Sequence, residues 1–247
     1  MKSLRITLRT ERPIVLPLAY NELIHGLLYK CWSEQAPQLH GFKLEDGRDF
    51  RPFVFGRLEG PCRVDKDAKQ ICFFSRISLD VRSPLDGLID ACAIHLANSG
   101  RARIGAYELE LVNLECHDRL LFPGRALVRL RTPVVAYVTL DSGHKQPFGP
   151  QDPEWLPLIQ QNTQRKLAAM GMDGDVSLQS IARTETLKKN VTTFKRTYVT
   201  GWTGDIELTS DPSVIALLWS CGLGMSNSGG FGLFDIVDFE DRRSRYQ

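Results

Sequence analysis

The sequence predicts an α+β protein built of two consecutive domains with the same plan, with a glycine-rich loop near the C-terminus. Three observations predict this. The chain has 247 residues, of which 43% are apolar and 24% are charged, and this suits one large domain or two of ordinary size. Strand-like and helix-like patterns follow one another in the same order in both halves. Five glycines lie between residues 222 and 232.

The first half begins with strict alternation of apolar and polar residues over 3–9, which predicts a strand, and a helix is expected to begin near Tyr20. On that helix, His25, Tyr29 and Trp32 are expected to lie off the apolar face. The other elements expected in this half are strands at 50–58, 70–75, 76–82 and 101–117 and a helix that ends at Gly100. This order is the ferredoxin-like (RRM-like) plan with additional strands.

The second half begins after the pattern pauses at Phe122-Pro123-Gly124, so we expect domains at 1–122 and 123–247. Its expected elements are an alternating strand run from residue 126, a helix at 153–170, strands at 176–183, 186–200 and 205–209, a short helix from Asp211 and a last strand after residue 230. The order of the first half is repeated without similarity between individual residues. The sequence therefore predicts two tandem ferredoxin-like domains.

Several classes of protein are disfavoured by what the sequence lacks. No apolar run is long enough for a membrane helix, and the alternating N-terminus does not match a secretion signal, so we expect a cytoplasmic protein. The six cysteines are scattered and include no Cys-x-x-Cys pair, so they are expected to be reduced. The sequence also contains no metal-ligand spacing and no G-x-S-x-G elbow. We therefore expect no metal and no cofactor.

The loop Gly222-Leu223-Gly224-Met225-Ser226-Asn227-Ser228-Gly229-Gly230-Phe231-Gly232 follows a helix and precedes a strand. A dinucleotide-binding fingerprint needs the opposite context and a glycine where Asn227 stands, so that interpretation fails. A plain connector is the other alternative. Two triplets with an apolar centre, Gly-Leu-Gly and Gly-Phe-Gly, favour an ordered loop with a function.

With this loop, the chain resembles the RAMP superfamily of CRISPR-associated RNA-binding proteins and, more narrowly, its CRISPR repeat-RNA processing endoribonucleases. The resemblance extends over nearly the whole chain. The segments that carry it, besides the loop, are Leu16-Pro17, Tyr20-Asn21, Leu27-Leu28-Tyr29, Leu39-His40-Gly41-Phe42, Phe53-Val54-Phe55 and Thr132-Pro133-Val134. It implies CRISPR repeat RNA as a partner, and it leaves open both membership of an effector complex and a homodimer.

The resemblance also implies a catalytic set of His40, Tyr29 and Arg51, which would cleave RNA without metal through attack of a ribose 2′-hydroxyl. Imidazole can act as acid or base near neutral pH, and a guanidinium binds phosphate oxygens through a fixed fork. Each residue has a plainer interpretation: a solvated loop histidine, a packing aromatic and an ordinary phosphate ligand. His25, one turn before Tyr29, is the reserve acid–base residue.

Net charge is only +2, but residues 123–204 hold eleven Lys and Arg against six Asp and Glu, a local excess suited to phosphates. Together with the glycine-rich loop, this region supplies the residues predicted to bind RNA: Arg183, Lys188, Lys189, Lys195, Arg196, Gly222, Gly224, Ser226, Asn227, Ser228, Gly230 and Gly232. In one strand, Phe194, Tyr198 and Trp202 would project to one side. The centre of the loop has no cation, unlike the loops of most family members.

Two further functions stay open at this stage. The chain could be a noncatalytic relative that holds repeat RNA while another nuclease cuts it, which the charge-poor loop favours. A more distant alternative is a tandem RRM-like RNA binder unrelated to CRISPR. The histidine, tyrosine and arginine set favours the endoribonuclease.

Overall fold

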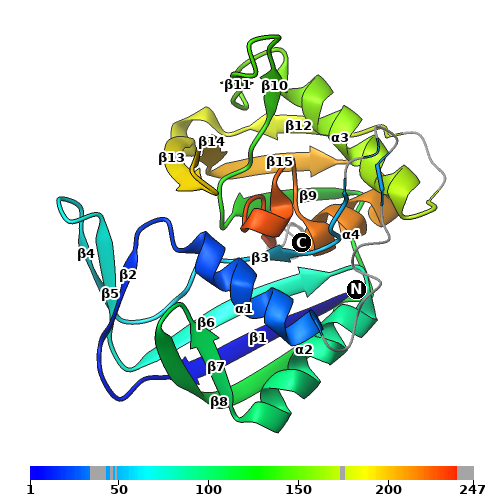
Figure 1. Cartoon of the computed structure of the whole chain (residues 1–247). Helices are drawn as coiled ribbons and strands as arrows, with labels where there is room; N and C mark the ends of the chain where they lie inside the picture. The colour runs from blue at the N-terminus through cyan, green and yellow to red at the C-terminus, as the bar shows by residue number, and fades with distance from the viewer. Residues whose placement is uncertain (34–42, 45–46, 48, 173–175, 238–247) are drawn as a thin grey trace, which may run out of the picture.

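Each half of the chain forms an antiparallel sheet with two helices packed on one face (Figure 1). This computed structural model describes residues 1–33, 43–44, 47, 49–172 and 176–237. In Figure 1 the first half lies below, with α1 and α2 in front of its sheet, and the second half lies above. The predicted α+β class with two ferredoxin-like halves is confirmed.

The first half contains a five-stranded sheet in which alternate side chains of each central strand face the helices. In β1, Leu4, Ile6 and Leu8 are buried while the residues between them face away. The strands in spatial order are β3 (Val54–Phe55), β6 (Arg76–Ser83), β1 (Lys2–Arg9), β8 (Tyr107–Asp118) and β7 (Arg101–Ile104). The helices are α1 (Asn21–Ser33) and α2 (Asp86–Ser99). A small sheet beside them contains β2 (Ile14–Pro17), β5 (Gln70–Phe73) and β4 (Cys62–Asp65).

As the sequence predicted, the second half repeats the element order of the first, and its four-stranded sheet repeats the spatial order of β3, β6, β1 and β8. Its sheet runs β12 (Gln179–Ala182), β15 (Asp205–Thr209), β9 (Arg125–Leu130) and β16 (Phe234–Val237). Its helices are α3 (Trp155–Ala169) and α4 (Pro212–Cys221). Two hairpins are added to the plan: β10 (Tyr137–Thr139) with β11 (Lys145–Pro147), and β13 (Lys188–Phe194) with β14 (Thr197–Thr203). The short 3₁₀ helices are η2 (Thr184–Thr186) and η3 (Asn227–Gly229).

Separate hydrophobic cores lie between each sheet and its helices. The first is built from residues between Leu4 and Leu109 and the second mainly from residues between Ala126 and Phe234. Phe50 is an exception, because it comes from the first half and is buried in the second core. The segment just before β3 therefore crosses to the second half, and this crossing brings its neighbour Arg51 to the junction.

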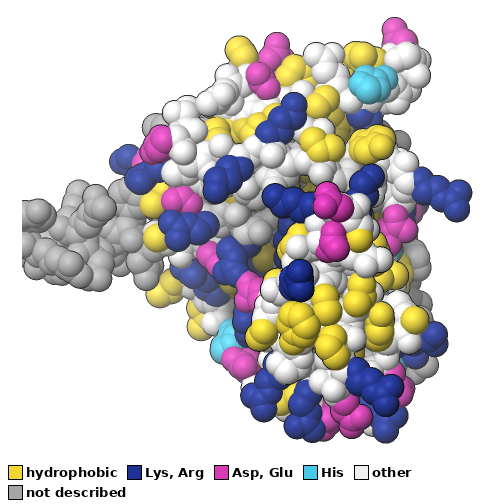
Figure 2. Space-filling view, turned by 90° about the vertical axis from the view of Figure 1, so that its left-hand side faces the viewer, with side chains coloured by type: hydrophobic (Ala, Val, Ile, Leu, Met, Phe, Trp, Pro, Cys, Tyr) yellow, Lys and Arg dark blue, Asp and Glu magenta, His cyan; other side chains and the backbone are white. Residues whose placement is uncertain are grey.

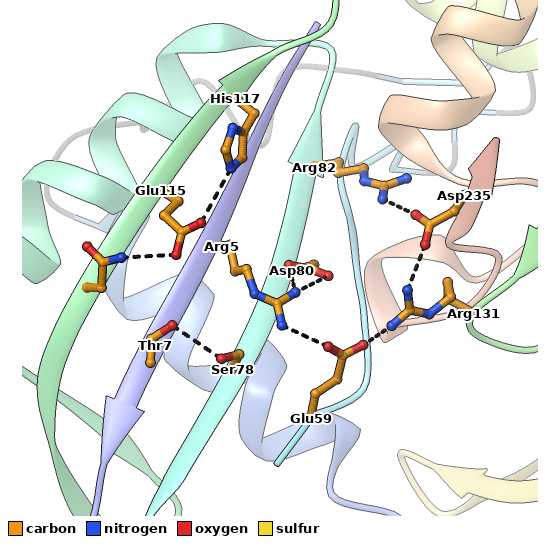
Figure 3. Close-up of polar contacts among 11 residues, drawn as sticks. Arg5, Thr7, Glu59, Ser78, Asp80, Arg82, Glu115, His117, Arg131 and Asp235 are labelled. Atoms are coloured by element: carbon orange, nitrogen blue, oxygen red, sulfur yellow. Dashed lines mark hydrogen bonds and ion pairs between the residues drawn. The ribbon is translucent and has the colours of Figure 1, made fainter. Parts of the chain in front are cut away.

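A chain of ion pairs joins the two halves (Figure 3). Arg82 of β6 is buried, and its Nη2 lies 2.6 Å from Oδ1 of Asp235 in β16. Its guanidinium carbon lies 4.3 Å from the centroid of the Trp219 ring. Arg131 binds the other oxygen of Asp235 at 2.7 Å and also pairs with Glu59. Glu59 in turn pairs with Arg5 of β1 at 2.9 Å. Because the charges alternate across the junction, the network favours one relative position of the halves.

Two expectations about individual elements are wrong. Trp32 is fully buried and its Nε1 donates to the carbonyl of Leu88 at 2.8 Å, because α1 packs against both α2 and Phe53 and so buries a wider face than its aliphatic stripe. The strand predicted at 186–200 is instead a hairpin, which turns at Lys195 and Arg196, both with positive φ. Strands β2 and β4, not predicted, pair with β5.

Candidate active site

Helix α1 carries two rings one turn apart, His25 and Tyr29, which stack with centroids 4.4 Å apart and 23° between their planes. Arg51 joins them from the segment before β3, with its guanidinium carbon 5.5 Å from the Tyr29 ring centroid. The structure thus brings together two of the three candidate catalytic residues and the reserve histidine. His40, the third candidate, lies outside the described residues.

The electrostatics of this cluster set the protonation of both rings. Burial, followed by the nearby charges of Lys195 and Arg51, lowers the pKa of His25 from 6.5 to about 4. Burial raises the pKa of Tyr29, although Arg51 acts in the opposite direction. Near neutral pH the imidazole is therefore neutral and able to accept a proton, while the phenol keeps its proton and can donate a hydrogen bond.

The lowered pKa of His25 predicts a pH dependence of stability. Between pH 6.5 and pH 4 the unfolded chain binds a proton that folded His25 does not, so the free energy of unfolding falls as pH falls. Because His25 is partly exposed, we expect its contribution to the free energy of unfolding to fall by only about 1 kcal/mol, which corresponds to a decrease in Tm of about 2 to 4 °C. Thermal unfolding at pH 7 and pH 5 tests this: between the two pH values, the Tm of His25→Phe should decrease less than the Tm of the wild type. Equal decreases would contradict the prediction.

Arg51 is held only loosely by the residues around it. Its Nη2 lies 3.8 Å from a carboxylate oxygen of Asp49, and 27% of its side chain is exposed. Its Nε is buried and meets no hydrogen-bond acceptor in the described part of the chain. A buried guanidinium donor without an acceptor is costly unless a ligand supplies one. Arg51 is therefore placed to bind an anion such as a phosphoryl oxygen.

The tip of the β13–β14 hairpin reaches the same cluster. The backbone N–H of Lys195 donates to the carboxylate of Glu22 in α1. Phe194 lies with its ring centroid 6.0 Å from that of His25 and 6.2 Å from that of Phe231. Because the chain turns at Lys195 and Arg196, Phe194 faces the opposite side of the hairpin from Tyr198 and Trp202, contrary to our expectation of a common face. The turn brings two predicted RNA-binding cations beside the candidate catalytic residues.

The glycine-rich loop lies between the two halves. Asn21, the first residue of α1, donates from its side-chain amide to the carbonyl of Gly229 at 2.7 Å. Gly230 has a φ of +83°, and a Cβ there would lie 2.5 Å from the Phe55 ring. Asn227 is buried and its amide donates to the carbonyls of Leu223 and Phe231. The loop is therefore ordered and packed against α1 and β3.

A buried lysine, which the sequence analysis missed, holds the start of this loop. Lys166 of α3 is only 2% exposed and donates to the carbonyls of Gly222 at 2.7 Å and Gly224 at 2.8 Å. Burial lowers its pKa to about 8. In the sequence, Lys166 follows Arg165 on a helix and carries no signal that separates it from a solvated cation. Only the packing of α3 against the loop assigns its role.

A cavity of about 420 Å³, which we call the Arg51 cavity, opens between the two halves at this site. The segment before β3, helix α3, strand β10 and the glycine-rich loop line it. Its lining includes Asp49, Arg51, Tyr137, Gln161, Asn162, Arg165, Lys166, Met225, Ser226, Asn227 and Ser228. The described part of its lining carries three Arg or Lys side chains and one carboxylate, an excess of positive charge that suits an anionic ligand.

The residues predicted to bind RNA fall into three groups. Lys195 and Arg196 lie at the hairpin tip near His25, whereas Lys188, Lys189 and Arg183 lie at the other end of the hairpin. All five are exposed. Of the loop residues, Gly222, Gly224, Asn227, Gly230 and Gly232 are buried, and Ser226 and Ser228 are half-buried and line the Arg51 cavity. In Figure 2, which views the side of β13 and β4, Lys and Arg side chains gather around a hollow at mid-height.

The comparisons with known proteins agree with this architecture. Residues 118–236 match the family model for the C-terminal part of the CRISPR associated protein Cas6. Among solved structures, the chain is similar to a Cas6-related protein of Pyrococcus furiosus (TM-score 0.82, 16% identity, 96% of this chain and 99% of that chain). It is also similar to a RAMP protein binding different RNA substrates (0.79, 15%, 96% and 100%) and to a Cas6 product complex (0.66, 17%, 96% and 99%). No curated protein matches the sequence significantly.

The chain therefore has the fold of these structures, with two ferredoxin-like halves. More narrowly, residues 118–236 match the Cas6 C-terminal family model, and the whole chain has the fold of the Cas6 structures to which it is similar. The resemblance indicated by the sequence is thus confirmed.

Two further features are absent from the described residues. They contain no group of three or more His, Cys, Asp or Glu side chains that could hold a metal ion. Among the helices described, none has the length and apolar character needed to cross a membrane.

Proposed function

We propose that the chain is a metal-independent endoribonuclease that cleaves CRISPR precursor RNA within its repeats, leaving a 2′,3′-cyclic phosphate and a 5′-hydroxyl. The Cas6 C-terminal match supports RNA processing as the general function, and the product complex of a similar Cas6 supports RNA as the substrate. The observation that carries the proposal is the cluster of Tyr29, Arg51 and a neutral imidazole beside a cavity lined by the glycine-rich loop.

In the proposed reaction, the ribose 2′-oxygen attacks the adjacent phosphorus while the bond between phosphorus and the 5′-oxygen breaks. A base takes the proton of the 2′-hydroxyl, and an acid gives a proton to the departing 5′-oxygen. His40 and Tyr29 are the proposed pair for these transfers. His25 is the alternative base, because its imidazole is neutral near pH 7 and stacks on Tyr29.

Arg51 has the electrostatic role in this proposal. Negative charge accumulates on the nonbridging oxygens as the 2′-oxygen attacks, and a guanidinium that lies ready beside them stabilises this charge. The buried Nε of Arg51 has no acceptor among the described residues, which supports this role. Asp49, 3.8 Å away, compensates part of the charge when no RNA is bound.

The proposed RNA path leads from the Arg51 cavity along the β13–β14 hairpin. Ser226 and Ser228 offer hydroxyl groups to the sugar-phosphate backbone in the cavity. Lys195 and Arg196 follow at the hairpin tip, and Lys188, Lys189 and Arg183 at its far end extend the basic track. The buried glycines of the loop act through their close packing, which gives the cavity its shape.

One cleavage assay tests the proposal. The protein is incubated with repeat RNA in EDTA, and with the same RNA carrying a single 2′-deoxy substitution at the cut site. Cleavage of the first RNA only, with a 2′,3′-cyclic phosphate at the new end, is the expected result. Cleavage that requires a divalent ion would contradict the proposed chemistry.

A noncatalytic role in holding repeat RNA is the second candidate, favoured by the lack of any cation between Met225 and Gly229. In the same assay this alternative predicts tight binding of both RNAs and cleavage of neither. Binding to unrelated RNAs with equal affinity would instead indicate a general RRM-like RNA binder.

A further inference from the structure

A second cavity lies beside the Arg51 cavity, between the two inserted hairpins of the second half. We call it the Tyr198 cavity, and its volume is about 600 Å³. The β10–β11 hairpin forms one wall with Tyr137, His144 and Lys145, and the β13–β14 hairpin forms the other with Arg196 and Tyr198. This volume lies within the range of about 300–1,000 Å³ typical of small-ligand sites.

The chemistry of this lining is that of a cationic site with aromatic walls. Among the residues that the structure describes, the lining includes Lys145 and Arg196 and no acidic side chain. The ammonium nitrogen of Lys145 lies 4.5 Å from the centroid of the Tyr137 ring, so this ring is already covered by a cation. The charges therefore favour an anionic ligand, and the aromatic walls favour one that carries a flat apolar group.

Tyr198 is the aromatic side chain available to such a ligand. It is 78% exposed, although an aromatic of this size normally gains from burial. It pairs across the hairpin with Thr193, which offers little apolar surface to cover the ring. The hairpin therefore presents Tyr198 at the edge of the cavity, where one face of the ring can receive a planar group.

The two cavities are neighbours that share part of their lining. Tyr137 and Ser226 line both of them, so a polymer that occupies the Arg51 cavity can extend into the Tyr198 cavity past these two residues. The sequence alone did not indicate this, because His144 has no helpful neighbours in the chain. In the fold, the β10–β11 hairpin places it in the lining of the same cavity as Arg196.

We propose that the Tyr198 cavity binds one unpaired nucleotide of the RNA next to the cleaved phosphate, with its base stacked on Tyr198 and its phosphate between Lys145 and Arg196. The proposal rests on the endoribonuclease function proposed above. An aromatic side chain can stack a base only when the base has left its own helix, so the nucleotide must be single-stranded. The site would thus position the RNA strand at a fixed distance from Arg51.

Binding measurements on noncleavable repeat RNA with a 2′-deoxy cut site test this proposal. Tyr198→Ala should weaken binding about 10-fold at fixed salt, because it removes one base-stacking contact. Tyr198→Phe keeps the stacking ring and should bind as the wild type does. Val191→Ala is the matched control, because Val191 is 61% exposed on the same face of the hairpin but does not line the cavity.

A fluorescence scan identifies the nucleotide. Repeat RNAs carrying 2-aminopurine at successive positions should include one whose fluorescence is quenched on binding to the wild type and to Tyr198→Phe, but not to Tyr198→Ala. If Tyr198→Ala binds and quenches as the wild type does while the wild type still cleaves repeat RNA, the nucleotide site is wrong and the proposed function stands. If the wild type neither binds nor cleaves repeat RNA, both proposals fail.

Discussion

Replacing Arg51 with alanine is expected to lower the single-turnover rate of repeat-RNA cleavage by about 10²- to 10³-fold, while RNA affinity changes much less. In the proposed reaction, the guanidinium interacts most strongly with charge that develops as the 2′-oxygen attacks, and a contact stronger in the transition state mainly affects the rate. The structure supports this role through the location of Arg51 at the cavity, 5.5 Å from the Tyr29 ring centroid. Rapid-quench kinetics at saturating protein would measure the effect.

Two control variants make the Arg51 result specific. Arg51→Lys keeps a positive charge without the planar fork, so it should recover part of the lost rate. Arg63→Ala removes an exposed arginine from β4, on the small sheet of the first half, and should cleave at the wild-type rate. If Arg51→Ala binds more weakly but cleaves normally once saturated, Arg51 is only a phosphate ligand and the proposed electrostatic role is wrong.

Replacing Gly232 with alanine is expected to destabilise the chain by about 3 to 5 kcal/mol, which corresponds to a decrease in Tm of about 10 °C. Gly232 has a φ of +81°, and a Cβ there would lie 2.0 Å from the carbonyl oxygen of Leu223. The same residue accepts from the N–H of Leu223 and donates to the carbonyl of Pro133. Because backbone meets backbone on both sides, the loop cannot accommodate the methyl group without moving.

Gly171→Ala is the matched control for this prediction. Gly171 also has a positive φ, +66°, but a Cβ there would meet nothing within 4 Å. Gly171→Ala should therefore destabilise the chain by only about 1 kcal/mol, the cost of placing an alanine in the left-handed backbone conformation. Thermal and urea unfolding of the two variants side by side would separate the clash from the backbone preference. Equal losses of stability would show that the glycine-rich loop is not closely packed.

Part of this architecture was predictable because it depends on local patterns. Alternation in residues 3–9 predicted β1, and the helix predicted to end at Gly100 is α2, whose last carbonyls are capped by that glycine. The hairpin at Lys195 and Arg196 was not predictable in the same way. Neither residue is typical of a turn with positive φ, and the contact of Lys195 with Glu22 of α1, 173 positions away, forms only in the folded chain.

For the candidate site, the sequence by itself determined which residues are candidates for the chemistry: a tyrosine on the first helix, an arginine before β3 and glycines spaced for a tightly packed loop. The tertiary structure alone decided how they meet. Four features depend on packing between elements that are distant in the chain. They are the stacking of His25 on Tyr29, the burial of Phe50 in the second core, the contact of buried Lys166 with the loop, and the place of Ser226 in the lining of both cavities. The physical reason is that the burial of a side chain and the electric field around it depend on every element packed against it. The periodicity of the sequence reports only on the element that carries the side chain.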